Sequence, residues 1–190
     1  FGFGLSLAQK LDAPILIIKT SWGGKSLNYN FRPPSAGPYK LNEKEQTAKN
    51  AADISKNASL NWRMMNEAVH NVLKDLKTHH PAYDAKVGYD IAGFVWFQGW
   101  NDQYQDRWLT YEKNMANFIR DVRKEFKAPN MKFVIGQMGN DGMKPDKEGS
   151  SRDYIKKAQD AVPNLPEFKN NVICVKTDQY WDMEAHAIYT

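Results

Sequence analysis

Four short hydrophobic runs divide the chain, and each has the length and composition of a buried strand. They are rich in β-branched residues and do not alternate with polar residues, as expected where helices cover both faces of a parallel sheet. The runs are residues 14–18, 91–97, 132–136 and 171–175. Each run therefore predicts one strand of a parallel sheet.

Segments with a helical period lie between these strands. Hydrophobic positions recur every three or four residues over residues 62–76 and 111–126, which is the pattern of a helix with one buried face. Weaker helical patterns cover residues 5–11 and 154–162. The alternating order predicts an α/β fold, a three-layer α/β/α arrangement with a mostly parallel, flavodoxin-like sheet and right-handed crossovers. We expect a single domain over residues 1–190.

Two long connections follow predicted strands. Residues 21–59 separate the first strand from the next helix, and loops beyond roughly 15 residues are usually functional or disordered. This connection holds Tyr29, Phe31 and Tyr39, and aromatic rings on a loop suit sugar faces, so we favour a functional loop. The alternative is that the rings only pin the loop to the domain. The second connection, residues 139–150, is polar and rich in glycine.

Charge and cysteine content narrow the classes of function. The chain has 26 lysines and arginines against 22 aspartates and glutamates, a net charge of +4 that is spread along the sequence, so we expect no nucleic-acid partner. Cys174 lies within a hydrophobic run and is expected to be a buried thiol. No stretch approaches the roughly 18 hydrophobic residues of a membrane span. No histidine pair has zinc-site spacing and no phosphate-binding motif occurs, so we expect no metal and no cofactor.

Adjacent glycines follow the first predicted strand, at Gly23 and Gly24. Glycines let the backbone approach a ligand closely and turn its N–H groups toward a developing negative charge. The pair alone is weak evidence, and it lacks the spacing of the Walker and G-x-G-x-x-G motifs, so we expect no nucleotide site.

Side-chain amides and a carboxylate follow the second predicted strand, at Gln98, Asn101 and Asp102. An amide beside a backbone N–H could stabilise the oxyanion formed when a serine attacks an ester. The alternative is that Asn101 and Asp102 only cap a helix or shape a turn. Because parallel strands end at one edge of a sheet, we expect this turn to lie beside the glycine turn.

These two segments resemble conserved blocks of the SGNH hydrolase superfamily, and most closely its sialate O-acetylesterase-like branch of carbohydrate esterases. The glycine of the second block is matched by Gly23 or Gly24, and the third block by residues 98–102, Gln-Gly-Trp-Asn-Asp. The resemblance implies a serine esterase that removes acetyl groups from sugars through an acyl-enzyme, without a cofactor.

The resemblance also implies roles for individual residues. The glycine backbone and the Asn101 side chain would donate to the oxyanion, while Gln98 and Asp102 would shape the loop. The catalytic candidates are Gly23, Gly24, Gln98, Asn101, Asp182 and His186. The candidates for substrate binding are Trp22, Lys25, Trp100 and Asp102.

The nucleophile and the base depart from the family pattern. The family's serine stands in a Gly-x-Ser block that we expect upstream of Phe1, and Ser6 does not match it. The family's last block, Asp-x-x-His, is matched only loosely by Asp182 and His186, which are one residue too far apart. They could be an ordinary surface pair, with the base beyond Thr190. We therefore expect the domain to lack its nucleophile block and its C-terminal end.

The expected partner is an acetylated carbohydrate, and the oligomeric state stays open. The resemblance implies a secreted or periplasmic protein. Two alternatives remain: a noncatalytic carbohydrate-binding domain, and an esterase of the same fold that acts on lipid or simple esters.

Overall fold

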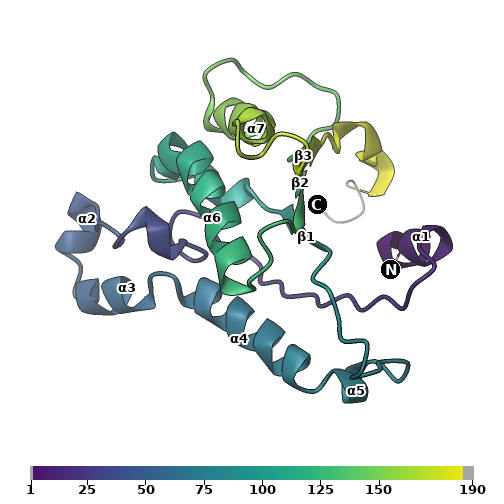
Figure 1. Ribbon diagram of the computed structural model, residues 1–190. Coiled ribbons are helices and arrows are strands. Elements are labelled where there is room, and N and C mark those ends of the chain that lie inside the picture. The colour runs from purple at the N-terminus through teal and green to yellow at the C-terminus, as the bar shows by residue number, and fades with distance from the viewer. Residues whose placement is uncertain (1, 186–190) are drawn as a thin grey trace. The chain divides into compact units, whose positions relative to one another are not determined.

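The computed structural model describes residues 2–185, which form two compact units (Figure 1). The smaller unit comprises Phe1–Gly23 and Arg63–Asp90, and the larger comprises Gly24–Trp62 and Ile91–Thr190. No helix among the described residues has both the length and the hydrophobicity to cross a bilayer. The sheet and the candidate oxyanion residue Asn101 belong to the larger unit.

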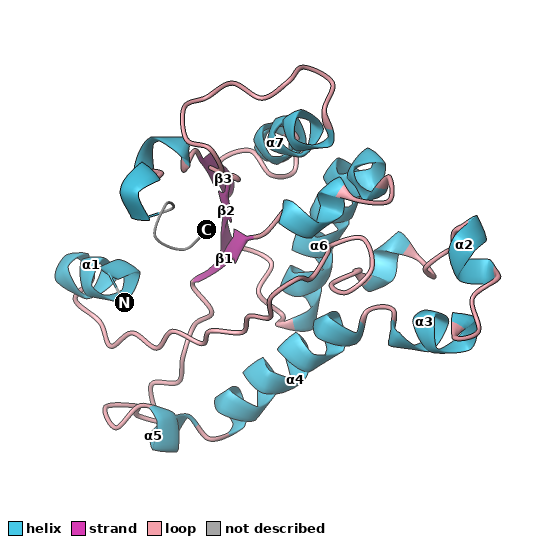
Figure 2. Ribbon diagram, turned by 180° about the vertical axis from the view of Figure 1, so that it is seen from behind, coloured by secondary structure: helices cyan, strands magenta, loops and turns pink. Residues whose placement is uncertain are grey.

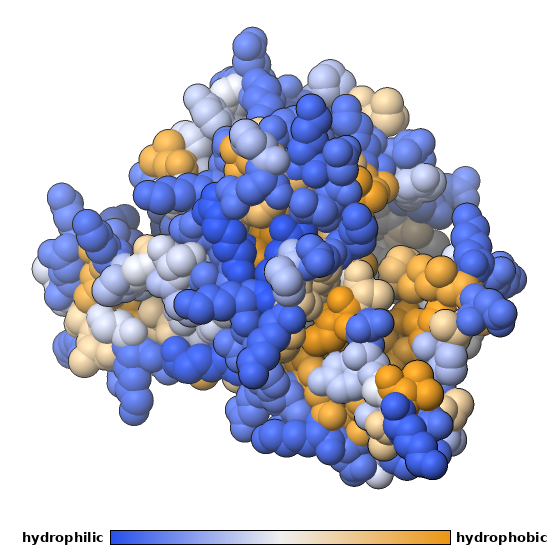
Figure 3. Space-filling model, viewed as in Figure 1, coloured by the Kyte–Doolittle hydropathy of each residue, from blue (hydrophilic) through white to orange (hydrophobic). Residues whose placement is uncertain are grey.

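The smaller unit is mostly helical. It contains α1 (Gly2–Lys10), most of α4 (Leu60–Lys74), and α5 (Leu76–His79). The predicted helices near residues 5–11 and 62–76 are thus confirmed, with a break at Asp75. Hydrophobic side chains lie on the surface over α1 (Figure 3), where Phe3 and Leu5 are each 54% exposed.

The predicted strand at residues 14–18 is wrong. These residues have no regular secondary structure, and the sheet of the described residues does not include them. Leu16 and Ile17 are 37% and 49% exposed. A β-branched run becomes a strand only where a neighbouring strand satisfies its backbone hydrogen bonds, and its composition does not reveal whether such a neighbour exists.

The other three predicted strands form one parallel sheet (Figure 2). They are β1 (Gly93–Phe97), β2 (Lys132–Gly136) and β3 (Val172–Val175), in the order β1-β2-β3. In register, Phe94 lies opposite Phe133, and Phe133 lies opposite Val172. A parallel sheet among helices confirms the predicted α/β class and is consistent with a three-layer α/β/α fold.

One face of this sheet packs against α6 (Tyr111–Glu125) and α7 (Ser151–Ala161), as the helical periods predict. Phe118 of α6 is fully buried, and its ring lies 4.4 Å from that of Trp96 and 5.8 Å from that of Phe94. Burying a phenylalanine side chain stabilises a fold by about 1.5–3 kcal/mol. Because α6 begins at the carboxyl end of β1, this packing also fixes the position of the loop between them.

The opposite face of the sheet is equally hydrophobic but exposed. Val95, Phe97 and Ile173 point away from α6, because side chains alternate along a strand. They are 52%, 69% and 54% exposed, respectively. The larger unit thus carries a hydrophobic surface on its sheet.

The connection over residues 21–59 holds short helices rather than a structureless loop. They are η1 (Pro34–Ala36), α2 (Glu43–Gln46) and α3 (Ala51–Asn57), and Asn42 and Glu45 form a capping box at the start of α2. Phe31 packs edge-on against Trp96 at 5.1 Å, and Tyr29 packs against Tyr39 at 4.8 Å. These rings therefore pin the connection in place, which was the alternative to a ligand-binding role.

Short 3-10 helices complete the larger unit. Two of them, η2 (Trp100–Gln103) and η3 (Arg107–Thr110), join β1 to α6. Two more, η4 (Val162–Asn164) and η5 (Asp178–Tyr180), follow α7 and β3. The first of these, η2, carries the amide and the carboxylate that the sequence singled out.

Candidate active site

Gly24 lies beside the side chain of Asn101. A Cβ atom added to Gly24 would stand 3.8 Å from Asn101 Nδ2. Gly24 has a φ of +67°, in the left-handed region where glycine costs far less than other residues. The half-buried Asn101 amide makes no hydrogen bond to another described residue. The Gly24 backbone and a side-chain amide without a hydrogen bond among the described residues thus lie side by side near the carboxyl end of β1.

Asp102 ties the glycine loop to the end of β1. Its carboxylate accepts the backbone N–H groups of Leu27 at 2.7 Å and Asn28 at 2.9 Å. The Asp102 side chain is fully buried. The structure therefore makes Asp102 an anchor of the loop rather than a surface group that could contact substrate.

Gln98 forms the second tie between the same segments. Its side-chain Nε2 donates to the Lys25 carbonyl at 2.9 Å and to Asp102 Oδ2 at 2.6 Å. The next residue, Gly99, is also constrained, because an added Cβ would stand 2.6 Å from Met138 Sδ. The Gln-Gly pair thus allows close packing between the ends of β1 and β2.

Tyr111 and Gln159 complete the buried polar network, and the sequence analysis missed both. The Tyr111 hydroxyl donates to the Gln98 carbonyl at 2.9 Å, and Gln159 Nε2 donates to the same carbonyl at 2.9 Å. Gln159 Oε1 accepts the Met138 N–H at 3.0 Å. Both side chains are fully buried. In the sequence, the feature that could have indicated Gln159 was a glutamine on the hydrophobic face of the helix predicted at residues 154–162.

Burial dominates the electrostatics of this network. It raises the pKa of Asp102 from 3.8 to about 6, although hydrogen bonds from Gln98, Leu27 and Asn28 oppose the shift. Burial and the nearby Asp102 charge also raise the pKa of Tyr111, so its hydroxyl stays protonated as a donor. Asp102 thus carries its charge at neutral pH and titrates slightly below it.

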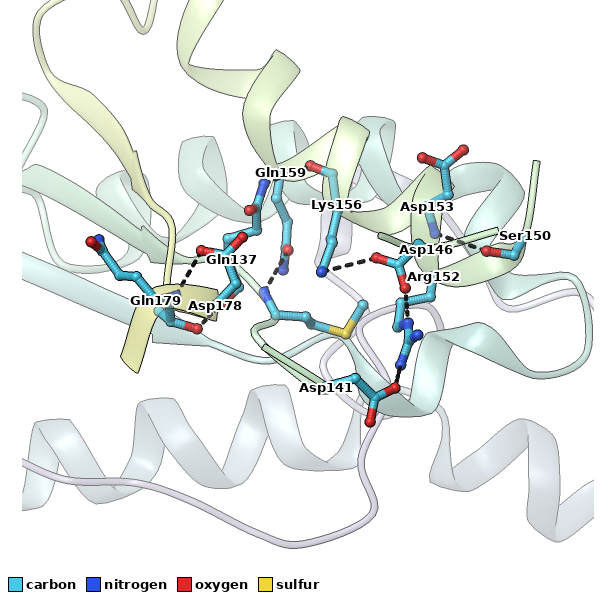
Figure 4. A network of polar contacts seen from close by, with 12 residues as sticks. Gln137, Asp141, Asp146, Ser150, Arg152, Asp153, Lys156, Gln159, Asp178 and Gln179 are labelled. Atoms are coloured by element: carbon cyan, nitrogen blue, oxygen red, sulfur yellow. Dashed lines mark hydrogen bonds and ion pairs between the residues drawn. The ribbon is translucent and has the colours of Figure 1, made fainter. Parts of the chain in front are cut away.

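The connection after β2 is held by a cluster of ion pairs (Figure 4). The Asp146 carboxylate pairs with Arg152 and, at 2.9 Å, with Lys156 Nζ. Arg152 also reaches Asp141 Oδ2 at 2.6 Å. The Ser150 hydroxyl accepts the Asp153 N–H and caps α7. A cap and ion pairs together fix this loop against α7.

The remaining substrate-binding candidates have different environments. Trp100 is 48% exposed beside Asn101 in η2, so its ring is available to a ligand. Lys25 is half-buried, and its carbonyl is bound by Gln98. Trp22, which is half-buried, and the exposed Gly23 belong to the smaller unit.

The Asp182 carboxylate and the serine nearest Gly24, Ser26, are both engaged in local hydrogen bonds. His186 lies outside the described residues. Asp182 Oδ1 accepts the N–H groups of Glu184 and Ala185, both at 2.9 Å, as a helix-capping residue does. Ser26 is fully buried, and its hydroxyl is bonded to Asn30 and accepts a backbone N–H. Ser26 therefore serves to shape the glycine loop.

Neither metal nor thiol chemistry has support in the described part of the chain. Over residues 2–185, no three histidine, cysteine, aspartate or glutamate side chains are grouped to hold a metal ion. Cys174 is half-buried, and burial together with Asp160 raises its pKa to about 12. A thiol that stays protonated is a poor nucleophile.

Comparison with known proteins identifies the family. The family model described as carbohydrate esterase, sialic acid-specific acetylesterase, matches residues 1–187. No curated protein matches the chain. Among solved structures, a protein from Arabidopsis thaliana is 18% identical with a TM-score of 0.42, over 62% of this chain and 40% of its own.

The chain belongs to the sialic acid-specific acetylesterase family of carbohydrate esterases. The resemblance to SGNH-type sialate O-acetylesterases is thereby confirmed. The family is described as one of carbohydrate esterases, which are hydrolases that act on esters.

Proposed function

We propose that the protein removes O-acetyl groups from sugars and that Gly24 and Asn101 stabilise the oxyanion of this reaction. The observation that carries the proposal is the position of Gly24 beside Asn101 Nδ2, with 3.8 Å between that amide and the added Cβ. Serine attack on the acetyl carbonyl places a negative charge on its oxygen, and a backbone N–H beside a side-chain amide can bind that charge.

Rigidity around the two donors supports this role. Asp102 and Gln98 hold the segment after Gly24, and Tyr111 and Gln159 hold the backbone of Gln98. Donors that are fixed before the reaction lose no free energy to reorganisation when the charge forms. The exposed Trp100 ring beside them favours a sugar, because aromatic faces pack against the C–H faces of carbohydrates.

The oxyanion role is tested by Asn101→Ala made in the full-length gene, with turnover measured on an acetylated sugar. We expect kcat to fall by roughly 10²–10³, with a much smaller change in KM. Asn130→Ala removes an exposed amide from the turn before β2 and serves as the matched control. Unchanged kcat in the Asn101 variant would refute the role.

Two further measurements separate the proposal from its alternatives. Fluorophosphonate labelling of the full-length gene product, followed by mass spectrometry, identifies a reactive serine, whereas a noncatalytic carbohydrate-binding domain stays unlabelled. Comparing acetylated sugars with p-nitrophenyl esters of longer acids distinguishes a carbohydrate esterase from one that acts on lipid or simple esters.

A further inference from the structure

A pocket of about 380 Å³ opens at the C-terminal end of α6. Arg123 on its wall donates to the carbonyl of Met131, the residue that precedes β2. The pocket therefore lies at the amino edge of the sheet, opposite the edge that carries Asn101. Its lining comprises Arg120, Arg123, Lys124, Lys127, Pro129, Glu167 and Phe168.

Two guanidinium groups form a rigid wall of this pocket. The central carbons of the Arg120 and Arg123 guanidinium groups stand 5.6 and 5.5 Å from the centre of the Phe168 ring, and Phe168 is 1% exposed. Arg120 pairs with Glu167 at 2.5 Å, and Arg123 donates to Asn171 Oδ1 at 2.7 Å. These contacts hold both cations in place without a ligand.

The pocket carries far more positive than negative charge. Four cations face one carboxylate, which leaves the lining with a net charge of +3. The ammonium groups of Lys124 and Lys127 have no side-chain partner among residues 2–185. Cations at a helix C-terminus offset its partial negative charge, but that charge is only about half a unit. Stabilisation of the helix end thus accounts for a small part of the lining charge.

Lys127 occupies a position that glycine would fill at lower cost. Its φ is +52°, and its N–H binds the Lys124 carbonyl just beyond the end of α6. Helices commonly end with glycine in this conformation, because a side chain is disfavoured there. A strained residue is a reason to look for a function of its side chain. Here the side chain adds a positive charge to the rim of the pocket.

We propose that this pocket binds a sulfate or phosphate ester group carried by a sugar. Lys124 and Lys127 contact the oxyanion, and the fixed guanidinium groups of Arg120 and Arg123 add to the attraction. The volume fits a small ligand, since ligand pockets measure roughly 300–1,000 Å³. The choice of a sugar as carrier rests on the proposed function, whereas the choice of an oxyanion rests on the lining alone.

Calorimetric titration with glucose 6-sulfate, glucose 6-phosphate, inorganic sulfate and unsubstituted glucose tests the proposal. We expect both esters to bind, the unsubstituted sugar not to bind, and added salt to weaken the binding. The ester that binds more tightly identifies the source of the anion. Binding of inorganic sulfate as tightly as the esters, or of a short oligonucleotide more tightly than either, would overturn the sugar assignment.

Variants separate a local site from the overall charge of the protein. Replacing Lys124 and Lys127 together by glutamine should weaken ester binding by about tenfold. Lys113→Gln with Lys147→Gln removes the same charge from exposed positions elsewhere. Equal weakening in both double variants, or no binding by the unaltered chain, would overturn the site. Binding is measured without turnover, so failure of the esterase assay leaves this result independent.

Lys127→Gly gives a second test, because a misfolded variant would not show the expected rise in Tm. Relief of the positive φ should raise Tm while the ester binds more weakly. A variant with higher Tm and unchanged ester affinity would overturn the role of Lys127.

Discussion

The Asp102 carboxylate accepts the backbone N–H of Leu27 at 2.7 Å, which joins residues 75 positions apart in the chain. Both residues are fully buried. A buried carboxylate is costly unless donors surround it, and Asp102 has three of them. The Asp102 side chain thus holds the glycine loop against the end of β1, together with Gln98.

Asp102→Asn should lower the free energy of unfolding at pH 7 by about 1–3 kcal/mol. The substitution keeps the shape, but the new amide nitrogen faces donors that need an acceptor. Urea unfolding measures the loss. Asp106→Asn, at an exposed position with no capping bond, is the control and should change little. Equal stability of the two variants would contradict the anchoring role.

Titration of Asp102 should make stability depend on pH between about 4 and 6. The folded state raises this pKa from 3.8 to about 6, so the folded protein holds the proton more tightly than the unfolded chain. Binding of this proton stabilises the folded state fully below pH 4. As the pH rises to 6 this contribution is lost, and the free energy of unfolding falls by about 3 kcal/mol. Measuring the free energy of unfolding of the wild type and of Asp102→Asn at several pH values isolates the effect. The stability of the wild type relative to the variant should fall with pH, and a rise would contradict the prediction.

Gly24→Ala should reduce both stability and esterase turnover. A side chain at a φ of +67° costs about 1–2 kcal/mol, and the new methyl group would stand against the Asn101 amide. Gly149→Ala also places a side chain at a positive φ, +73°, with no atom within 4 Å of the added Cβ. The two variants should lose similar stability, and only Gly24→Ala should lose activity. Equal esterase activity of the two variants would show that the space beside Asn101 is unimportant for turnover.

Tyr111→Phe should cost about 1 kcal/mol of stability and leave no cavity. It removes the hydroxyl that donates to the Gln98 carbonyl at 2.9 Å and keeps the ring. Thermal unfolding measures the loss, and Tyr154→Phe, at a 48% exposed position, is the control. A Tyr111 variant as stable as the wild type would mean that Gln159 alone satisfies this carbonyl.

Phe97→Thr should reduce self-association of the chain. Phe97 is 69% exposed on the uncovered face of the sheet, next to Val95, and exposed hydrophobic faces promote association. Sedimentation velocity over a range of concentrations measures the effect. Tyr104→Thr removes an aromatic ring that is 56% exposed in the loop after η2 and should leave association unchanged. If both variants associate like the wild type, the exposed face of the sheet is not responsible for self-association.

Much of the fold was predictable because hydrophobic periodicity reports local burial. The runs that became β1, β2 and β3 are β-branched, and each has a neighbour to pair with. The run at residues 14–18 has the same composition and is not a strand. What differs is the presence of a pairing partner, and that is a property of the whole fold.

The candidate site was only partly predictable for a similar reason. Gln98, Asn101 and Asp102 follow the run that became β1, so their location at the end of a strand could be expected. Gly24 follows the run at residues 14–18, which is not a strand. Tyr111 was counted as one more hydrophobic position on a helix, and Gln159 as a polar interruption. Their contacts with Gln98 arise only when α6 and α7 pack on the sheet.

The buried network around Gln98 also restricts how the sequence can diverge. The network consists of Gln98, Asp102, Tyr111 and Gln159. A substitution at one of them leaves a hydrogen-bonding group without its partner, so tolerated substitutions are expected to occur together with compensating ones. Trp100 and Gln103 share the same short helix but not these bonds to other segments. Relatives are therefore expected to vary freely at those two positions while the four buried ones covary.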